Sequence, residues 1–578
     1  MILPTSTLVF ALGAFLSLPS ASLGGLVQKQ GLAVPPAYGS HQGEVKQIFL
    51  DSYNAYKKFA DGHDDVSPVS QTFSDGRNGW GATIIDAMST MKIMDLNDLF
   101  ADAVKFASNI DFSKSKTSDT VSVFETTIRY VGGLLSAYEL SGKQYQPLLD
   151  KAKEVADKMA YAWVGKNNIP YGHIDFSTNI PSTATSNIAE AGTLTLEWAR
   201  LAQYTGNMTY KALAENAALH IANLGVQFPG LPAQGIDPST GLSVGKYITW
   251  GGGSDSYFEY LIKYARTDNS VSPDFADSWR TAVDSSIQVL RKTSTVGDHV
   301  YLADYDGSKI RHVGSHLACF HGGNWLLGGQ LLNNVTIVEI GLELTDACWN
   351  TYARTATQIG PEVFAFISKD GGYTGGSPPS AEQNAFYELN GFYITAADYV
   401  LRPEVLESNF YAWRVTGNVK YLDRAASAIQ SFRDYLSVKK ADGTVGYVGI
   451  DDVDNKESSR IDDTESFWFA EVLKYLYLTF DDPSRYSLDE YVFNTEAHPL
   501  KVPSGTADAT YGTGKLRTSY SPFKTTTGST PAVSPIPNIG NVVARVVDGL
   551  VESTVKTRGS NRRSRRSKHR RSFASASL

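Results

Sequence analysis

Residues 194–207 read LTLEWARLAQYTGN, and this stretch carries the pattern that decides the fold. Leu194, Trp198 and Leu201 are spaced four and three residues apart, which places them on one face of a helix. Gly206 follows, and glycine readily adopts the left-handed backbone conformation in which many helices end. The stretch therefore predicts a helix that ends in a short polar loop.

The same alternation of helix and short loop continues on both sides, from about residue 43 to about residue 480. Val415-Thr416-Gly417-Asn418 repeats the Thr-Gly-Asn loop after another aromatic helical segment. An alternation sustained over more than 400 residues favours an all-α fold in which helices form concentric layers, an α-toroid. In such a fold we expect the loops at one end to carry the functional site.

The composition is that of a large globular protein. Of the 578 residues, 42% are hydrophobic and 19% are charged, which gives ample material for a core. Aromatic residues make up 11%, as suits a protein that offers flat faces to sugar rings, although a large core uses them equally. The net charge of −8 includes nine Lys and Arg between residues 556 and 571, so the rest of the chain carries −17. We therefore expect no nucleic-acid partner.

The two ends of the chain differ from its body. Residues 1–22 contain a short apolar run followed by small residues, which predicts a signal peptide and a secreted protein of the secretory pathway. A retained membrane anchor is the alternative, although the run is too short to span a bilayer. Residues 503–578 begin as a segment rich in Ser, Thr and Pro, which predicts a linker, and end in a basic segment that predicts a disordered tail.

Two further features agree with export. Cys319 and Cys348 are the only cysteines, and in a secreted chain one disulfide is the expected state. Asn207-Met208-Thr209 and Asn334-Val335-Thr336 are sequons for N-glycosylation, a weak signal alone. No other long apolar stretch occurs, so we expect no stable insertion into a membrane.

Residues 491–500, YVFNTEAHPL, end the region that we expect to fold. A strand-like apolar run delivers Thr495, Glu496 and His498 in quick succession before Pro499 stops it. Hard oxygens at the end of a buried strand suit Ca²⁺ or a polyol substrate. A plain strand end followed by a polar turn explains the spacing equally well.

Many acidic side chains lie near predicted helix starts or on apolar helix faces, and each has a structural explanation. Glu125 and Arg129 are four residues apart, as in an ordinary surface ion pair. Asp255 opens an aromatic helix, where it could be a cap. Glu404 and Glu407 follow Pro403, where carboxylates complement the helix dipole.

Taken together, however, these carboxylates share one feature: they lie beside aromatic residues in the sequence. Two more carboxylates do the same, Glu362, which follows Pro361, and Glu471, which comes four residues after Phe467. A proton donor, a base and rings for stacking are what a glycosidase pocket needs. The chain has no Gly-x-Ser-x-Gly elbow, no Walker loop and no His-Glu-x-x-His motif, so the corresponding enzyme classes are disfavoured.

The chain resembles the class I α-1,2-mannosidases of glycoside hydrolase family 47, most closely the secreted fungal members, because its motifs occur in the order in which that family has them. The matching stretches cover about residues 43–500 and are 79–86, 124–138, 189–194, 255–257, 316–320, 360–362, 401–408, 465–477 and 493–499. The resemblance implies an (α/α)₇ barrel over residues 43–502, with short β elements plugging one end. It also implies hydrolysis, with inversion, of terminal α-1,2-linked mannose from high-mannose N-glycans.

The resemblance also implies roles for individual residues. Glu125 would be the general acid, directly or through a water, and Glu404 the base. Asp255 is the other central carboxylate and the alternative acid. Glu362 belongs to the acidic set, and Thr495 would hold Ca²⁺ through its hydroxyl and carbonyl oxygens. The sugar subsite would be lined by Arg129, His316, Arg402, Glu407, Phe467, Glu471 and Glu496, and Cys319 and Cys348 match the family's disulfide.

Physical chemistry adds one requirement to these roles. A general acid must be neutral at the working pH, and apolar burial by Phe124 and Tyr130 could keep the Glu125 carboxyl neutral. The chain also departs from the family pattern, for example at Met91-Lys92-Ile93-Met94, which replaces a more usual Leu-Tyr pair. Ser89 stands where many members have Asp, and Gly253 stands where narrow-specificity endoplasmic-reticulum members carry Arg, which implies broader trimming. A catalytically silent glycan-binding protein on the same barrel is the alternative function, and we expect a monomer in either case.

Overall fold

The computed structural model describes residues 26–267, 271–503 and 511–529. The predicted signal peptide and the basic tail lie outside these described residues. Within the described ranges, no helix is both long enough and apolar enough to cross a membrane.

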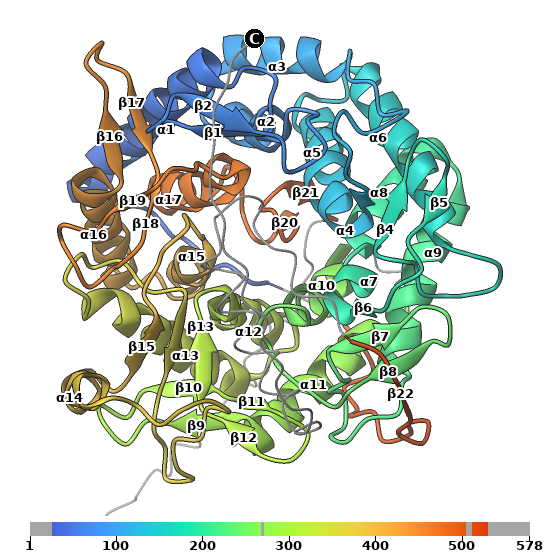
Figure 1. Cartoon of the computed structure of the whole chain (residues 1–578), viewed down its shortest axis with the longest axis vertical. Coiled ribbons are helices and arrows are strands. Elements are labelled where there is room, and N and C mark those ends of the chain that lie inside the picture. The colour runs from blue at the N-terminus through green and yellow to red at the C-terminus, as the bar shows by residue number, and fades with distance from the viewer. Residues whose placement is uncertain (1–25, 268–270, 504–510, 530–578) are drawn as a thin grey trace, which may run out of the picture.

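Two concentric layers of helices form a closed ring (Figure 1). In the described chain, seven helices make the inner layer: α2 (Ala82–Ile93), α5 (Gly132–Leu140), α8 (Thr195–Thr205), α10 (Asp255–Thr267), α12 (Phe320–Leu331), α15 (Glu404–Thr416) and α17 (Leu473–Phe480). Seven others alternate with them and cover them: α1 (Gly39–Phe59), α3 (Asn97–Ala107), α6 (Gln146–Met159), α9 (Met208–Ala222), α11 (Asp274–Val289), α13 (Val335–Ala353) and α16 (Lys420–Tyr435). Helix α1 packs on α17 and closes the ring. The predicted α-toroid is confirmed.

Burial explains why the two layers differ in sequence. Inner helix α12 is buried on every side, and a Cβ at its Gly328 would overlap the Trp279 ring of α11. Outer helix α6 is amphipathic, with a buried stripe at a spacing of three and four residues. The predicted helix within residues 194–207 is present as α8. It ends at Gly206, whose φ is +72° and whose N–H donates to the Ala202 carbonyl.

Short strands join the helices. They form two-stranded sheets from β1 (Asp65–Ser67) and β2 (Thr72–Ser74), β9 (Arg291–Thr293) and β10 (Val300–Leu302), β11 (Asp304–Tyr305) and β12 (Ile310–Arg311), β16 (Ser437–Lys439) and β17 (Val445–Tyr447), β18 (Gly449–Ile450) and β19 (Arg460–Ile461), and β20 (Tyr491–Phe493) and β21 (Pro499–Lys501). Larger sheets contain β3 (Val121–Ser122), β4 (His173–Asp175) and β5 (Ile180–Pro181), and β13 (Val313–Ser315), β14 (Val363–Ala365) and β15 (Tyr393–Ala396). Short helices α4 (Val123–Thr126), α7 (Ile188–Gly192) and α14 (Ala381–Asn390) complete the connections.

The β20–β21 hairpin lies inside the ring, where it plugs the barrel (Figure 1). Its strands are antiparallel, with Phe493 opposite Pro499, and the turn of residues 494–498 lies between them. The hairpin packs against inner helices α5 and α10. The short β plug that the resemblance implied is therefore present.

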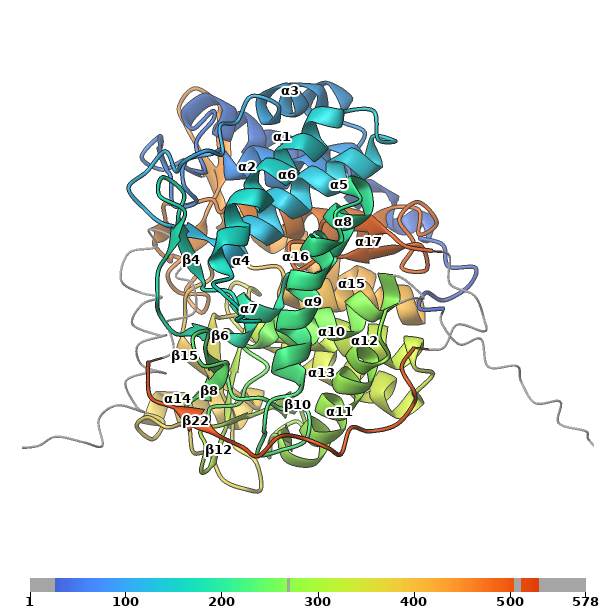
Figure 2. The same cartoon turned by 90° about the vertical axis from the view of Figure 1, so that its right-hand side faces the viewer.

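Residues 511–529, the described part of the predicted linker, run along the outside of the barrel (Figure 2). We call this segment the strap. It ends in β22 (Thr525–Thr526), which adds a parallel strand to β8 (Leu242–Val244), followed in the same sheet by β7 (Gly235–Asp237) and β6 (Ser186–Asn187). Composition alone predicted a linker, and the structure shows that this part of it is packed against the folded body.

Candidate active site

A pocket opens at the N-terminal ends of inner helices α10 and α15 and reaches the turn of the β20–β21 hairpin. Ten of the predicted site residues line it: Glu125, Arg129, Asp255, Arg402, Glu404, Glu407, Phe467, Glu471, Thr495 and Glu496. His316 and Glu362 stand behind its wall and contact Glu404 and Arg402. Four polar residues that were not predicted from the sequence also line the pocket: Arg77, Asn187, Glu190 and Glu259. Of these, Glu259 had a detectable signal, because it lies one helical turn after Asp255.

Glu125 lies between two guanidinium groups. Arg129 Nε donates to its Oε2 at 2.9 Å, and Arg77 Nη1 lies 3.5 Å from the same oxygen. Burial alone would raise the pKa of Glu125, but the charges of Arg77 and Arg129 outweigh burial and hold the pKa below its usual value. The expectation that apolar burial keeps this carboxyl neutral was therefore wrong. Glu125 and Arg129 do form an i,i+4 pair, but a largely enclosed one, with the Glu125 side chain 15% and the Arg129 side chain 6% exposed.

Asp255 is the first residue of α10, and its Oδ1 accepts a hydrogen bond of 2.7 Å from the Ser256 N–H. Burial raises the pKa of Asp255 to about 7, and the nearby negative charges of Glu259 and Glu404 add to this effect. The Asp255 carboxyl can therefore hold a proton near neutral pH. The hydrogen bond from Ser256 acts against this rise, so a structural role at the helix start does not explain the raised pKa of Asp255.

Glu404 opens α15, and its carboxylate faces two basic groups. His316 Nδ1 lies 2.8 Å from Oε2, and Arg402 Nη1 lies 3.8 Å from Oε1. Burial opposes ionisation, but the hydrogen bond and charge of His316, together with Arg402, lower the pKa of Glu404. Glu404 is therefore a carboxylate over most of the pH range.

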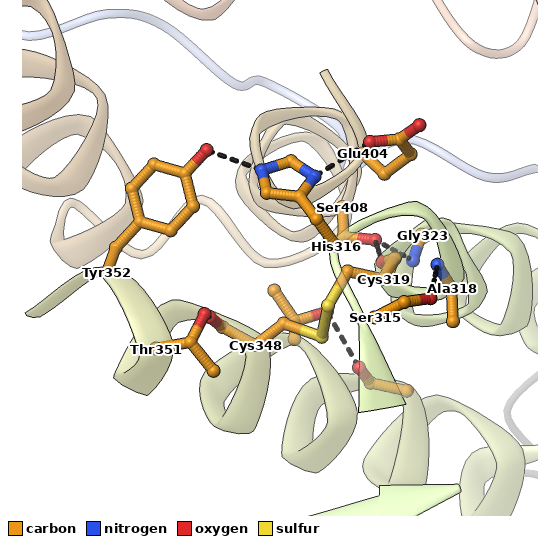
Figure 3. Close-up of a disulfide and its surroundings, with 12 residues drawn as sticks. Ser315, His316, Ala318, Cys319, Gly323, Cys348, Thr351, Tyr352, Glu404 and Ser408 are labelled. Carbon is orange, nitrogen blue, oxygen red and sulfur yellow. Dashed lines mark hydrogen bonds and ion pairs between the residues drawn. A yellow bond between two sulfur atoms is a disulfide. The ribbon is translucent and has the colours of Figure 1, made fainter. Parts of the chain in front are cut away.

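The orientation of His316 is fixed from its other side (Figure 3). Its Nε2 lies 2.6 Å from the Tyr352 hydroxyl, so the ring bridges Tyr352 and Glu404. The disulfide between Cys319 and Cys348 joins the start of α12 to α13 close to this bridge, which confirms the predicted pairing. Arg402, the second basic group beside Glu404, is itself held by Glu362. The Arg402 Nε donates to Glu362 Oε2 at 2.5 Å. Glu362 thus holds Arg402 in place and does not line the pocket itself.

Acidic groups outnumber basic groups in the pocket. Burial raises the pKa of Glu407 to about 8, with smaller contributions from Glu259 and Glu404. Burial and the charge of Glu496 raise the pKa of Glu471 well above its usual value. The pocket thus gathers more carboxyl groups than cationic groups, and a bound divalent cation would favour the ionised form of the carboxyl groups.

The hairpin turn offers oxygens for such a cation. Thr495 lines the pocket, and neither its hydroxyl nor its carbonyl oxygen accepts a hydrogen bond from the described residues. Three other carbonyls of the turn, those of Asn494, Ala497 and His498, are used by N–H or ammonium donors. Two neutral hard oxygens with acidic groups nearby fit Ca²⁺, which takes hydroxyl, carbonyl and water ligands. In the described chain no three His, Cys, Asp or Glu side chains cluster as direct metal ligands. The donor set therefore fits an ion that is held mainly by Thr495 and water.

Comparisons with known proteins agree with this geometry. Residues 48–502 match the model of glycosyl hydrolase family 47. A probable mannosyl-oligosaccharide α-1,2-mannosidase 1B of Aspergillus clavatus is 38% identical over 87% of this chain and 99% of its own. A mannosyl-oligosaccharide α-1,2-mannosidase of Coccidioides posadasii is 40% identical over 79% of this chain and 90% of its own. The solved α-1,2-mannosidase from Trichoderma reesei superposes with a TM-score of 0.77 at 37% identity, over 80% of this chain and 99% of its own. This chain belongs to glycosyl hydrolase family 47.

Proposed function

We propose that the protein hydrolyses terminal α-1,2-linked mannose from oligomannosides, including high-mannose N-glycans, with inversion and with dependence on Ca²⁺. The relatives named above carry the name α-1,2-mannosidase, and in this chain the predicted acidic residues line one pocket, apart from Glu362, which holds Arg402 behind its wall. One observation carries the mechanism. A carboxyl with a raised pKa, Asp255, and a carboxylate with a lowered pKa, Glu404, line the same pocket.

An inverting glycosidase needs such a pair of carboxyl groups. A base removes a proton from water as the water attacks the anomeric carbon, while an acid protonates the departing glycosidic oxygen. Glu404, oriented by His316, is the proposed base. Asp255 is the proposed acid in place of Glu125, because of these two carboxyl groups only Asp255 has a raised pKa and holds its proton near neutral pH. Glu125 and Arg129 then bind and orient the sugar.

We place Ca²⁺ on the hydroxyl and carbonyl oxygens of Thr495. When bound, the ion supplies ligand sites for vicinal sugar hydroxyls and can favour a distorted ring. Phe467 lies in the same pocket, with the Arg129 guanidinium 5.8 Å from its ring centroid, and offers a face to the sugar. Gly253, whose φ is +82°, leaves the pocket wall without a side chain and suits trimming of several α-1,2-linked mannoses.

The remaining proposals concern the whole chain. We propose residues 1–22 as a signal peptide, residues 43–502 as the catalytic domain and the secretory pathway as the location, with the enzyme acting as a monomer. A silent glycan-binding protein on this barrel is the alternative, but the intact Glu404–His316 contact favours catalysis.

Release of mannose from α-1,2-mannobiose tests the proposal. We expect release that a chelator abolishes and Ca²⁺ restores, with β-mannose as the first product by NMR. Glu404→Gln should lower kcat by about 10² or more, because general-base catalysis typically contributes 10²–10⁴. Lack of release from any α-1,2-mannoside with metal present would contradict the enzyme assignment, and α-mannose as first product would contradict inversion.

A further inference from the structure

Two buried side chains that have no part in the proposed mechanism, Glu197 and Tyr260, connect to the proposed calcium ligand Thr495. Glu197 on α8 is fully buried, and its Oε1 accepts hydrogen bonds from the Tyr260 hydroxyl at 2.5 Å and from Asn494 Nδ2 at 2.8 Å. The Tyr260 oxygen in turn lies 3.2 Å from the Thr495 backbone nitrogen, which donates to it. A continuous chain of contacts thus leads from Glu197 to the backbone of Thr495.

The direction of these hydrogen bonds is fixed. The Thr495 N–H can only donate, so the Tyr260 oxygen is its acceptor, and the single hydroxyl proton of Tyr260 then goes to Glu197 Oε1. The Tyr260 oxygen is then left with lone pairs only, and it accepts from the Thr495 N–H. If Tyr260 instead pointed its proton toward Thr495, that N–H would lose its partner inside the barrel. Glu197 therefore sets the polarity of the contact that holds Thr495.

The rest of the turn is held just as completely. Asn494 Oδ1 accepts from the N–H groups of Glu496 and His498, while its Nδ2 donates to the Ile128 carbonyl as well as to Glu197. Every N–H from residue 494 to residue 498 has a partner. The Thr495 hydroxyl and carbonyl oxygens thus project from a turn whose donors are all engaged.

Core packing gives no reason for a carboxylate at position 197. Glu197 Oε2 has no hydrogen-bond partner among the described residues, and burying an unsatisfied polar atom costs free energy. An apolar side chain would avoid that cost but would leave the Tyr260 hydroxyl and Asn494 Nδ2 without this acceptor, so the carboxyl serves these two donors and not the packing.

We propose that Glu197 and Tyr260 are positioning residues for calcium, which fix the Thr495 peptide so that its two oxygens are already oriented for the ion. The inference rests on the proposed Ca²⁺ site at Thr495. Groups that orient metal ligands without touching the metal commonly change its affinity by about 10- to 100-fold. The affinity comes from preorganisation, because the free turn already has its bound shape.

Calorimetric titration of CaCl₂ into the metal-stripped full chain tests this inference without using activity. Tyr260→Phe removes the acceptor for the Thr495 N–H and should weaken Ca²⁺ binding by about 10- to 100-fold. Tyr257→Phe is the matched control, because Tyr257 is an equally buried tyrosine on the same helix and does not line the pocket. It should bind Ca²⁺ as the wild type does.

Two further variants separate the possible failures. Glu197→Gln replaces the carboxyl acceptor of the Tyr260 proton with an amide oxygen, a weaker acceptor, and should also weaken binding. This variant decides the question if Tyr260→Phe does not fold by circular dichroism. Thr495→Ala tests the proposed calcium site itself. Loss of affinity in Thr495→Ala with unchanged affinity in Tyr260→Phe and Glu197→Gln would overturn this inference alone. A wild type that binds no Ca²⁺, or a Thr495→Ala variant that binds normally, would overturn the proposed site and this inference with it.

Discussion

At the scale of single residues, the two candidate acids differ in the charges around them. Burial raises the pKa of Asp255 to about 7, whereas Arg77 and Arg129 hold the pKa of Glu125 low. If Asp255 donates the proton, activity should fall as pH rises through about 7, because the donor ionises. Asp255→Asn should lower kcat by about 10²–10⁴ and remove this basic limb from the profile of kcat/KM against pH.

Glu125→Gln is the matched variant for this prediction. It should raise KM, since Glu125 orients Arg129, but it should keep the basic limb near pH 7. The reverse pattern would have the basic limb of the pH profile lost in Glu125→Gln and kept in Asp255→Asn. It would make Glu125 the general acid, as the resemblance to the family implied.

Local spacing could predict which residues belong to the site but not how they interact. The Glu125–Arg129 pair is visible in the sequence because its members are one helical turn apart. Arg77 is not visible, because it lies in a loop 48 positions earlier and meets Glu125 only when the barrel closes. That unseen contact acts together with Arg129 to lower the pKa of Glu125, where apolar burial was expected to raise it. Likewise, nothing local connects Glu197 with Thr495.

At the scale of secondary-structure elements, the strap is held by identifiable contacts. Arg517 donates to Ser278 Oγ at 2.7 Å and to Asn223 Oδ1, and its backbone N–H donates to Thr281 Oγ1. Removing hydrogen bonds to a charged group costs about 1.5–3 kcal/mol. Arg517→Ala should therefore raise the rate of limited proteolysis within residues 511–529 by about 10-fold or more, because local opening becomes easier.

Lys515→Ala is the control for the strap. Lys515 is an exposed cation on the same segment, and its side chain makes no hydrogen bond to the described residues. Its replacement should leave the cleavage rate unchanged. Equal rates in Arg517→Ala and the wild type would show that the Arg517 contacts do not hold the strap.

Elements with a regular pattern could be predicted well, whereas the strap could not. Helix α8 and its end at Gly206 follow from apolar spacing and from glycine's backbone freedom. The strap has the Ser, Thr and Pro content of a linker, and it pairs with β8 through backbone groups that any sequence carries. Composition therefore gives no signal for that pairing.

At the scale of the whole molecule, buried carboxyl groups make stability depend on pH. Burial raises the pKa of Asp398 to about 7, with a contribution from the charge of Glu362, and burial raises that of Glu407 to about 8. In the unfolded chain both groups ionise near pH 4. Between about pH 4 and pH 7–8 the folded state therefore binds more protons than the unfolded state, so the free energy of unfolding falls as pH rises.

Asp398→Asn tests this relation in the metal-stripped protein. Neither oxygen of Asp398 has a hydrogen-bond partner among the described residues, so the asparagine removes a titrating group without breaking a hydrogen bond of the side chain. Denaturant unfolding from pH 5 to pH 8 should show a shallower loss of stability than in the wild type, and the variant should gain most at pH 8. The exposed Asp434→Asn should keep the wild-type slope. An unchanged slope in Asp398→Asn would mean that Asp398 ionises in the folded state as readily as in the unfolded chain, and would contradict this prediction.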